Sequence, residues 1–359
     1  MSEQPTGEPD DGCGFATIPQ LAADLRAGRT TAEELAERAC SALDSTGRQL
    51  NAVATVTRSR ARRAAVRAQR HIDEGDPSAL RGIPYGVKDS VAAAGSPTTW
   101  GSAYFRDQQL DEDAVVVARL GRAGGVLTGK LALSELAGVG LSRLPGSSMH
   151  GRGHNPWDAT RFAGGSSSGS AIAVAAGLLP YALGSETAGS IVGPAAFCGV
   201  TGLRPTFGLV PRTGVLSPVP SIDKVGVLAR SAEDCGTVLA AIAGRHAGDS
   251  ASRGRFSAVT PGPDRLRGIR VGFLTDELGE CEPGCRLALE TAVEEFRSVL
   301  PEFKARGLPA DLPYTRALET IMAAESAVTL RPYLNRADFR LADEHQLSSL
   351  RHGASTLAI

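Results

Sequence analysis

Short apolar runs of strand length alternate, between residues 31 and 127, with longer stretches that repeat apolar residues at helical spacing. The longer stretches predict amphipathic helices over residues 31–43, 58–72 and 113–123. The short runs predict strands over residues 50–56, 82–87 and 125–127. Because strands that alternate with helices are typical of βαβ units, this pattern predicts an α/β fold with a mixed, mainly parallel sheet and helices on both of its faces.

Local signals also mark where the first helix begins. Thr31 and Glu34 have the spacing of a capping box, in which each side chain accepts a hydrogen bond from a backbone N–H group of the first turn. The remaining predicted elements are strands over residues 181–184 and 268–274, and helices before Pro180, over 283–300 and over 312–350. Between them, residues 245–267 are rich in Gly, Ser, Arg and Pro and predict a long surface loop.

The composition is that of a folded globular protein. Apolar residues make up 42% and charged residues 21% of the 359 residues, which is sufficient for a large core. The net charge of −1, spread over mixed signs, gives no basis for binding nucleic acid or an anionic membrane surface. The polar residues 1–13 are interpreted as a tail in front of the folded part.

Nothing in the chain predicts a membrane or metal-binding protein. The N-terminus lacks the layout of a secretory signal, and the longest apolar stretch, residues 171–183, is shorter than the ~20 residues of a spanning helix. Cys281 and Cys285 lack the second Cys or His pair of a zinc site. We therefore expect a soluble cytoplasmic protein without a metal.

One stretch is strongly basic. Arginines at positions 58, 60, 62, 63, 67 and 70 fall within the predicted helix over residues 58–72. We interpret this run as a solvated helix face.

Lysine is rare here, because only four of the 38 basic residues are lysines. A lysine that is kept against such a bias can do what arginine cannot, which is to give up its proton. Lys88 follows the apolar segment 82–87, so its amine is expected to be partly buried, and burial lowers the pKa of a lysine. Lys88 is therefore a candidate general base. The alternative is a strand-end lysine that pairs with Asp89.

Two segments rich in small residues are candidates for a serine site. Residues 164–170 read Gly-Gly-Ser-Ser-Ser-Gly-Ser, and residues 185–190 read Ser-Glu-Thr-Ala-Gly-Ser. Each could be a flexible turn, or a loop whose N–H groups approach a ligand. None of the six histidines lies in these segments. A serine paired with a lysine therefore fits better than a serine paired with a histidine.

Taken in chain order, four segments resemble the amidase signature family. They are Gly86-Val87-Lys88-Asp89, Gly164-Gly165-Ser166-Ser167-Ser168-Gly169-Ser170-Ala171, Gly184-Ser185-Glu186-Thr187-Ala188-Gly189-Ser190-Ile191, and the run from Pro194 to Gly208. The resemblance extends more loosely from about Thr17 to Asp234. It implies a single amidase-signature domain over residues 14–359, with the signature core at about 82–235.

The resemblance also implies a Ser–cis-Ser–Lys triad. Ser190 stands at the position of the nucleophile, Lys88 at that of the base, and Ser166 at that of the bridging serine, after a cis Gly165–Ser166 bond. The oxyanion hole is implied at the N–H groups of Thr187, Ala188, Gly189 and Ser190. The implied reaction hydrolyses a small-molecule amide, at a C–N bond that is not a peptide bond, through an acyl-enzyme and without a cofactor.

Three departures from the family pattern leave alternatives open. Ala188 replaces a glycine that many members have before the nucleophile, although its N–H group is retained. Val192 replaces an arginine that often grips a substrate carboxylate, which disfavours the glutaminase-type subunit of a tRNA-dependent amidotransferase. The chain ends at Ile359, before the helices and strands that usually follow, so a truncated or non-catalytic relative is the other alternative. A homodimer is left open.

Overall fold

A computed structural model describes residues 13–140, 146–254, 256, 269–274, 281–300, 302–309 and 311–356. The chain divides into two compact units, one formed by Met1–Ala258 with Thr320–Ile359 and the other by Val259–Glu319. The predicted N-terminal tail lies outside the described residues, apart from Cys13.

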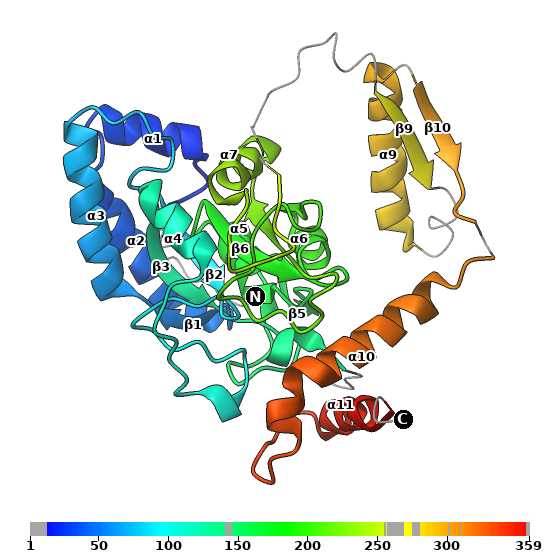
Figure 1. Cartoon of the computed structure of the whole chain (residues 1–359). Coiled ribbons are helices and arrows are strands. Elements are labelled where there is room, and N and C mark those ends of the chain that lie inside the picture. Colours follow the sequence, from blue (N-terminus) through cyan, green and yellow to red (C-terminus); the bar gives the residue numbers. More distant parts are fainter. Residues whose placement is uncertain are drawn as a thin grey trace, which may run out of the picture. The chain divides into compact units, whose positions relative to one another are not determined.

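The first unit is built around a mixed six-stranded sheet (Figure 1). In spatial order its strands are β1 (Val53–Val56), β3 (Val126–Leu131), β2 (Pro84–Lys88), β6 (Tyr181–Glu186), β8 (Lys224–Ala229) and β7 (Thr201–Leu203). The central strands β3, β2 and β6 are parallel, and the strands outside them are antiparallel to their neighbours. This arrangement confirms the predicted α/β class with a parallel sheet at its centre.

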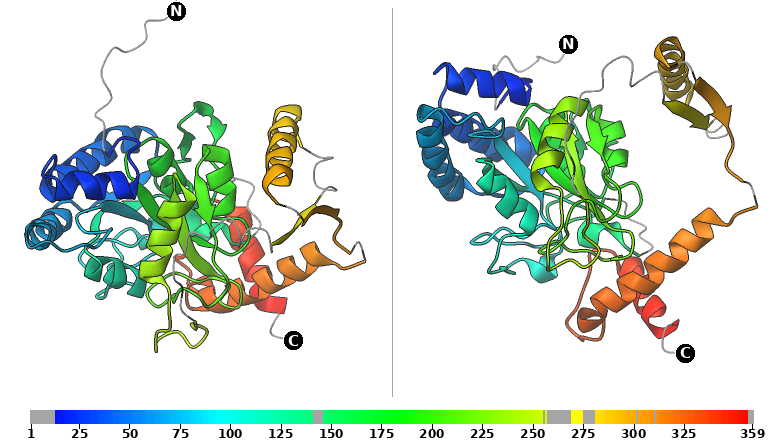
Figure 2. Two further views of the ribbon diagram at one scale, coloured as in Figure 1. Left: turned by 90° about the horizontal axis from the view of Figure 1, so that it is seen from above. Right: turned by 45° about the horizontal axis from the view of Figure 1, so that its top comes forward.

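Helices cover both faces of this sheet (Figures 1 and 2). They are α1 (Ile18–Arg26), α2 (Ala32–Ala42), α3 (Arg58–Asp73), α4 (Val115–Arg122), α5 (Ser168–Ala175), α6 (Val192–Cys198) and α7 (Ala232–Ile242). The predicted capping box is present at α2, where Thr31 Oγ1 accepts the Glu34 N–H at 3.2 Å and Glu34 Oε2 accepts the Thr31 N–H at 2.9 Å. Short elements join these helices: η1 (Leu43–Gly47), η2 (Ala103–Phe105), η3 (Glu135–Gly138) and the hairpin β4 (His154–Asn155) with β5 (Asp158–Phe162).

Helix α5 fixes the serine-rich loop against the sheet. All eight of its residues are buried, so it is a core helix and not the end of a flexible turn. Its small residues allow this approach, because a Cβ atom at Gly169 would lie 2.3 Å from the carbonyl oxygen of Ala52 and 2.6 Å from the amide nitrogen of Ala132. The residues just before α5 are therefore held rigidly beside β3.

The second unit contains a parallel pair of strands, β9 (Arg270–Leu274) and β10 (Glu302–Arg306), connected through α9 (Pro283–Val299). Pro283 lies in the first turn of α9, as predicted. Helix α10 (Tyr314–Leu334) begins in this unit and continues into the first unit, which also contains α11 (Glu344–Thr356). Among the residues that the structure describes, no helix has both the length and the apolar character needed to span a membrane.

The predicted loop over residues 245–267 is described only up to Gly254 and at residue 256. Sequence patterns missed the two antiparallel strands β7 and β8, because neighbouring residues 204–223 are rich in Gly and Pro and resemble one long loop. These strands pair with each other, and β8 also pairs with β6, so they depend on contacts that are distant in sequence.

Candidate active site

Strand β2 carries Lys88 at its C-terminal end, and the Lys88 side chain is fully buried. Its Nζ donates hydrogen bonds to Ser166 Oγ at 2.7 Å and to the carbonyl oxygen of Ser185 at 3.0 Å. The sheet therefore brings together residues from the ends of two neighbouring strands and from the serine-rich loop. The lysine identified from sequence contacts the serine that the resemblance places beside it.

Burial decides the charge of Lys88. Removal from water lowers its pKa to about 7, against the opposing influence of the Asp223 and Glu186 carboxylates, which raise it. The pKa of Asp223 is itself raised, again chiefly by burial. Near neutral pH a substantial fraction of Lys88 is consequently the free amine, which has a lone pair that can accept a proton.

Lys88 does not pair with Asp89. The Asp89 carboxylate instead contacts Lys130, with 2.7 Å between Nζ and Oδ1, and both side chains are fully buried. It also accepts the backbone N–H of Thr99 at 2.9 Å. Adjacent residues of an extended segment point to opposite sides, so Lys88 and Asp89 have different surroundings.

The loop before α5 places Ser166 between two other segments. The Gly165–Ser166 peptide bond is cis, as the resemblance implies. The carbonyl oxygen of Ser166 accepts the Ser134 N–H at 3.1 Å, and the Ser167 N–H donates to the carbonyl oxygen of Ser190, also at 3.1 Å. A Cβ atom on Gly165 would lie 2.7 Å from Ser134 Oγ, so a side chain at this position would displace that hydroxyl group.

The turn after β6 is held by the Glu186 carboxylate. Glu186 Oε2 accepts the backbone N–H groups of Ile191 at 2.7 Å and Val192 at 3.0 Å, which closes the turn around Ser190. Within the turn Gly189 has a φ of 88°, a conformation that residues with a side chain rarely adopt.

Asp223 and Lys224 also hold this turn. Thr187 Oγ1 donates to Asp223, and Lys224 Nζ donates to the carbonyl oxygen of Thr187 at 3.0 Å. Sequence reasoning missed both residues as parts of the site. They lie in and next to the Gly- and Pro-rich stretch, where no motif singles them out.

The backbone donors of this turn have no acceptor among the described residues. The hydrogen bonds formed among the described residues leave the N–H groups of Thr187, Ala188, Gly189 and Ser190 without an acceptor. Each of these groups is therefore available to a ligand oxygen.

Ser166 and Ser190 line one cavity of about 340 Å³. Gly165, Ala188 and Gln346 of α11 also line this cavity. Ser166 is 3% exposed, and Lys88 lies behind it without lining the cavity. Two serines therefore line the cavity, and the Lys88 amine is hydrogen-bonded to one of them, Ser166.

Gln346 supplies an acceptor whose orientation is fixed. Its Nε2 donates to the carbonyl oxygens of Val139 at 2.6 Å and Glu135 at 3.4 Å, so the side-chain amide cannot be turned around without losing both bonds. Oε1 is buried and receives no hydrogen bond within the described part of the chain. An unpaired buried acceptor is costly unless a ligand satisfies it. No sequence motif identified Gln346.

Glu135 also lines this cavity. Its Oε2 accepts the Ala342 N–H at 2.8 Å, and burial raises the pKa of this carboxyl group. The next residues, Leu136 and Ala137, have left-handed φ angles of 50° and 60°. Such conformations in residues other than glycine are uncommon and cluster at ligand sites.

Comparison with known proteins decides the family. The amidase family model matches residues 34–354. The chain belongs to the amidase signature family. This member therefore comes from a family of enzymes that act on carbon–nitrogen bonds.

Relatives of this family member include two curated proteins, each named as the A subunit of a glutamyl-tRNA(Gln) amidotransferase. The one from Chromohalobacter salexigens is 38% identical over 88% of this chain and 65% of its own length. The one from Deinococcus radiodurans is 38% identical over 79% of this chain and 58% of its own length. This chain thus spans less than two thirds of the length of these two relatives.

A solved structure has a closely similar fold. The native peptide amidase from Stenotrophomonas maltophilia superposes with a TM-score of 0.80 at 35% identity, covering 95% of this chain and 72% of its own. The fold of this family member is thereby confirmed as the amidase-signature fold.

Proposed function

We propose that this family member hydrolyses a carboxylic amide, at a C–N bond other than a peptide bond, to an acid and an amine or ammonia. The observation that carries the proposal is the fully buried Lys88 amine, 2.7 Å from the hydroxyl oxygen of Ser166, at a cavity that Ser190 also lines. A serine hydroxyl becomes an effective nucleophile only when a base accepts its proton. Lys88 is the base that this arrangement offers.

The proposed cycle moves protons along the three side chains. Neutral Lys88 accepts the hydroxyl proton of Ser166, which accepts that of Ser190, and Ser190 Oγ attacks the amide carbonyl carbon. The same path returns a proton to the leaving nitrogen, and the C–N bond breaks. Water then gives a proton to the same relay as it attacks the acyl-enzyme ester. The relay returns this proton to Ser190 Oγ as the C–O bond to Ser190 breaks, and the acid leaves.

The free N–H groups of the turn fit the role of the oxyanion hole. When Ser190 attacks, negative charge develops on the carbonyl oxygen, and the N–H groups of Thr187, Ala188, Gly189 and Ser190 have no competing acceptor among the described residues. The bonds from Ile191 and Val192 to Glu186 hold the turn in place before substrate arrives. Donors that are positioned in advance stabilise the transition state without reorganisation.

The test of the proposed function is covalent labelling of Ser190 with a fluorophosphonate probe, followed by mass spectrometry. We expect one adduct, on Ser190. Its rate of formation should rise as the pH is raised through about 7 and then level off, because only neutral Lys88 can accept a proton and burial lowers its pKa to about 7.

The control is Ser170→Ala, which removes a buried hydroxyl that donates to the carbonyl oxygen of Leu183 and lies outside the cavity lining. It should still be labelled, whereas Ser190→Ala should not. A folded wild-type chain that leaves Ser190 unlabelled at every pH would contradict the proposal and favour the non-catalytic alternative.

We further expect Gln346 to select substrates that offer a hydrogen-bond donor. Replacement by methionine removes both the Oε1 acceptor and the hydrogen bonds that Nε2 donates to Val139 and Glu135. For an amide with an additional N–H group on its acyl side, Gln346→Met should lower kcat/KM by about tenfold, mostly through KM. The measurement compares that substrate with its analogue in which the N–H is replaced by CH₂.

For the analogue without the N–H group, Gln346→Met should lower kcat/KM much less than it does for the parent substrate. Equal losses for both substrates would show that Gln346 only holds the Val139 backbone, to which its Nε2 donates at 2.6 Å. In that case the substitution changes the structure of the cavity lining and does not remove a contact to the substrate N–H group.

The glutaminase-type subunit of an amidotransferase is a second candidate, favoured by the names of the curated relatives. This function requires glutamine as substrate and partner subunits. Val192, 43% exposed, stands two residues after Ser190 and offers no positive charge for the glutamine carboxylate. Release of ammonia from glutamine at a rate above that from neutral amides would favour this candidate over the stand-alone amidase.

A further inference from the structure

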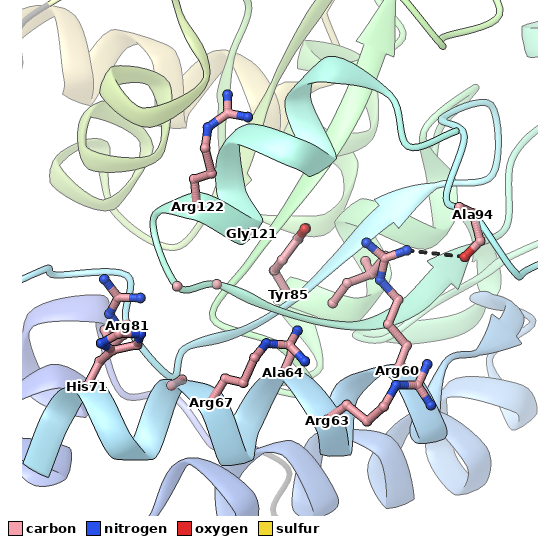
Figure 3. Close-up of a pocket in the computed structure, with 14 residues that line it drawn as sticks. Arg60, Arg63, Ala64, Arg67, His71, Arg81, Tyr85, Ala94, Gly121 and Arg122 are labelled. Atoms are coloured by element: carbon pink, nitrogen blue, oxygen red, sulfur yellow. Dashed lines mark hydrogen bonds between the residues drawn. The ribbon is translucent and has the colours of Figure 1, made fainter. Parts of the chain in front are cut away.

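A second cavity, of about 440 Å³, lies between α3 and the turn that connects α4 to β3 (Figure 3). Six of the residues that line it are basic, namely Arg60, Arg63, Arg67, His71, Arg81 and Arg122. The described lining contains no aspartate or glutamate. In a chain with a net charge of −1, this is a local concentration of positive charge.

The spacing along α3 creates the hollow. Arg60, Arg63, Arg67 and His71 follow one another at intervals of three and four residues, so they lie on one face of the helix. Ala64 and Ala68 also line the cavity, and their short side chains leave space between the long ones. Arg63, Arg67 and His71 are exposed, which confirms the predicted solvated helix face, and at these positions the face also lines the cavity.

The opposite wall leaves room because it consists largely of glycine. Gly121, Gly124 and Gly125 line it, and Arg122 extends from the end of α4 (Figure 3). Gly124 has a φ of 89°, and a Cβ atom there would lie 2.6 Å from Cδ of Arg81. The turn thus brings the Arg81 side chain against the backbone.

Only part of this positive charge is neutralised inside the protein. Arg60 pairs with Asp113 at 2.6 Å, Arg81 pairs with Asp76, and His71 Nδ1 lies 3.2 Å from Glu74 Oε2. Arg63, Arg67 and Arg122 form no ion pair or hydrogen bond with any described residue. Like charges around one cavity repel each other, and a bound anion would remove that repulsion.

Two polar groups at the cavity are donors that a ligand could reach. Tyr85 lines the cavity, and its hydroxyl group, which forms no hydrogen bond with a described residue, retains some accessible surface. Its ring stacks on that of Tyr181 with 5.4 Å between centroids, and the Tyr181 hydroxyl is buried without a partner in the same part of the structure. Nε of Arg81, which also lines the cavity, is another buried polar atom without a described partner. Buried donors normally have an acceptor.

We propose that this cavity binds a small phosphorylated anion, such as pyrophosphate or a nucleoside diphosphate. Guanidinium groups present paired N–H donors that match phosphate oxygens, and three of them here lack a partner among the described residues. The Tyr85 hydroxyl would donate to a further oxygen at the floor. A cavity of 440 Å³ is within the size range of small-molecule sites.

This site is separate from the candidate active site. Tyr85 is the second residue of β2 and Lys88 the last, so the two sites lie at opposite ends of the same strand. None of the described residues lines both cavities. The proposal therefore does not depend on the amidase activity.

The test is calorimetric titration of the purified full-length chain with sodium pyrophosphate and, separately, with adenosine diphosphate, at low ionic strength. The variant Arg63→Gln/Arg67→Gln removes two lining charges. Its matched control, Arg62→Gln/Arg70→Gln, removes two charges from exposed positions of the same helix that do not line this cavity. We expect the first pair to weaken binding by about tenfold or more and the control by less than about twofold.

Tyr85→Phe changes no charge and should weaken pyrophosphate binding severalfold if the floor hydroxyl contacts the ligand. Thermal unfolding of each variant shows whether it is folded. The proposal is overturned if the wild-type chain binds neither probe at millimolar concentration. It is equally overturned if both arginine pairs weaken binding to the same extent, or if citrate binds as tightly as pyrophosphate, because attraction would then be unspecific.

Discussion

Replacing Lys88 with methionine is expected to lower kcat for amide hydrolysis by at least about a thousandfold. Methionine has a similar length and no proton-accepting nitrogen, so it removes the proposed base and fills the same space. Lys88→Arg should be equally inactive, because a guanidinium group stays protonated at any working pH. The measurement is kcat with a neutral amide, combined with the labelling rate of Ser190.

Two observations separate a chemical effect from a folding effect. Lys88 is fully buried and its pKa is lowered to about 7 by that burial, so an apolar replacement should not unfold the chain, and thermal unfolding of Lys88→Met should remain close to that of the wild type. Lys304→Met, at an exposed position of β10, is the control and should retain full activity. Activity of Lys88→Met within tenfold of the wild type would exclude Lys88 as the base.

Replacing Lys130 with methionine is expected to reduce the free energy of unfolding by about 3–5 kcal/mol, the largest stability effect that we predict. The change leaves the fully buried Asp89 carboxylate without the ammonium group that now lies 2.7 Å away. An unpaired charge in the core is far more costly than the loss of a surface pair. Urea-induced unfolding of the purified variant measures this difference.

A second substitution distinguishes the charge from packing. Asp89→Asn in the Lys130→Met background removes the stranded charge but keeps an oxygen for the Thr99 N–H, and it should recover a large part of the loss. As the control, Arg29→Met breaks an exposed pair with Asp24 and should cost about 1 kcal/mol or less. A Lys130→Met variant as stable as the Arg29→Met variant would contradict the prediction.

The rarity of lysine in this chain has a physical basis at three of the four positions. Lys88 is a buried amine with a lowered pKa, Lys130 forms a fully buried ion pair, and Lys224 donates to the carbonyl oxygen of Thr187 in the turn before Ser190. A compact ammonium group fits each of these contacts. The sequence clue pointed correctly at Lys88 as a buried amine but did not show that Lys130 has a structural role.

The positions that sequence patterns missed share one feature. Asp223 and Gln346 reach the site from segments far along the chain, and neither lies in a motif that stands out by itself. Their importance depends on which atoms they meet: Asp223 accepts from Thr187, and Gln346 donates to Val139. Within the basic run, Arg60, Arg63 and Arg67 likewise line a cavity only because the turn with Gly124 and Gly125 contributes the rest of its lining.

Local sequence determined the parts of this protein whose interactions are local. The capping box at Thr31 and the period of α3 each act through neighbours within a few positions, and each predicted its element correctly. The tertiary structure decided the pairing of β8 with β6 and β7, the partner of Asp89, the fixed orientation of Gln346 and the basic cavity. These depend on burial and on contacts between segments far apart in the sequence, which only the folded chain brings within hydrogen-bonding distance.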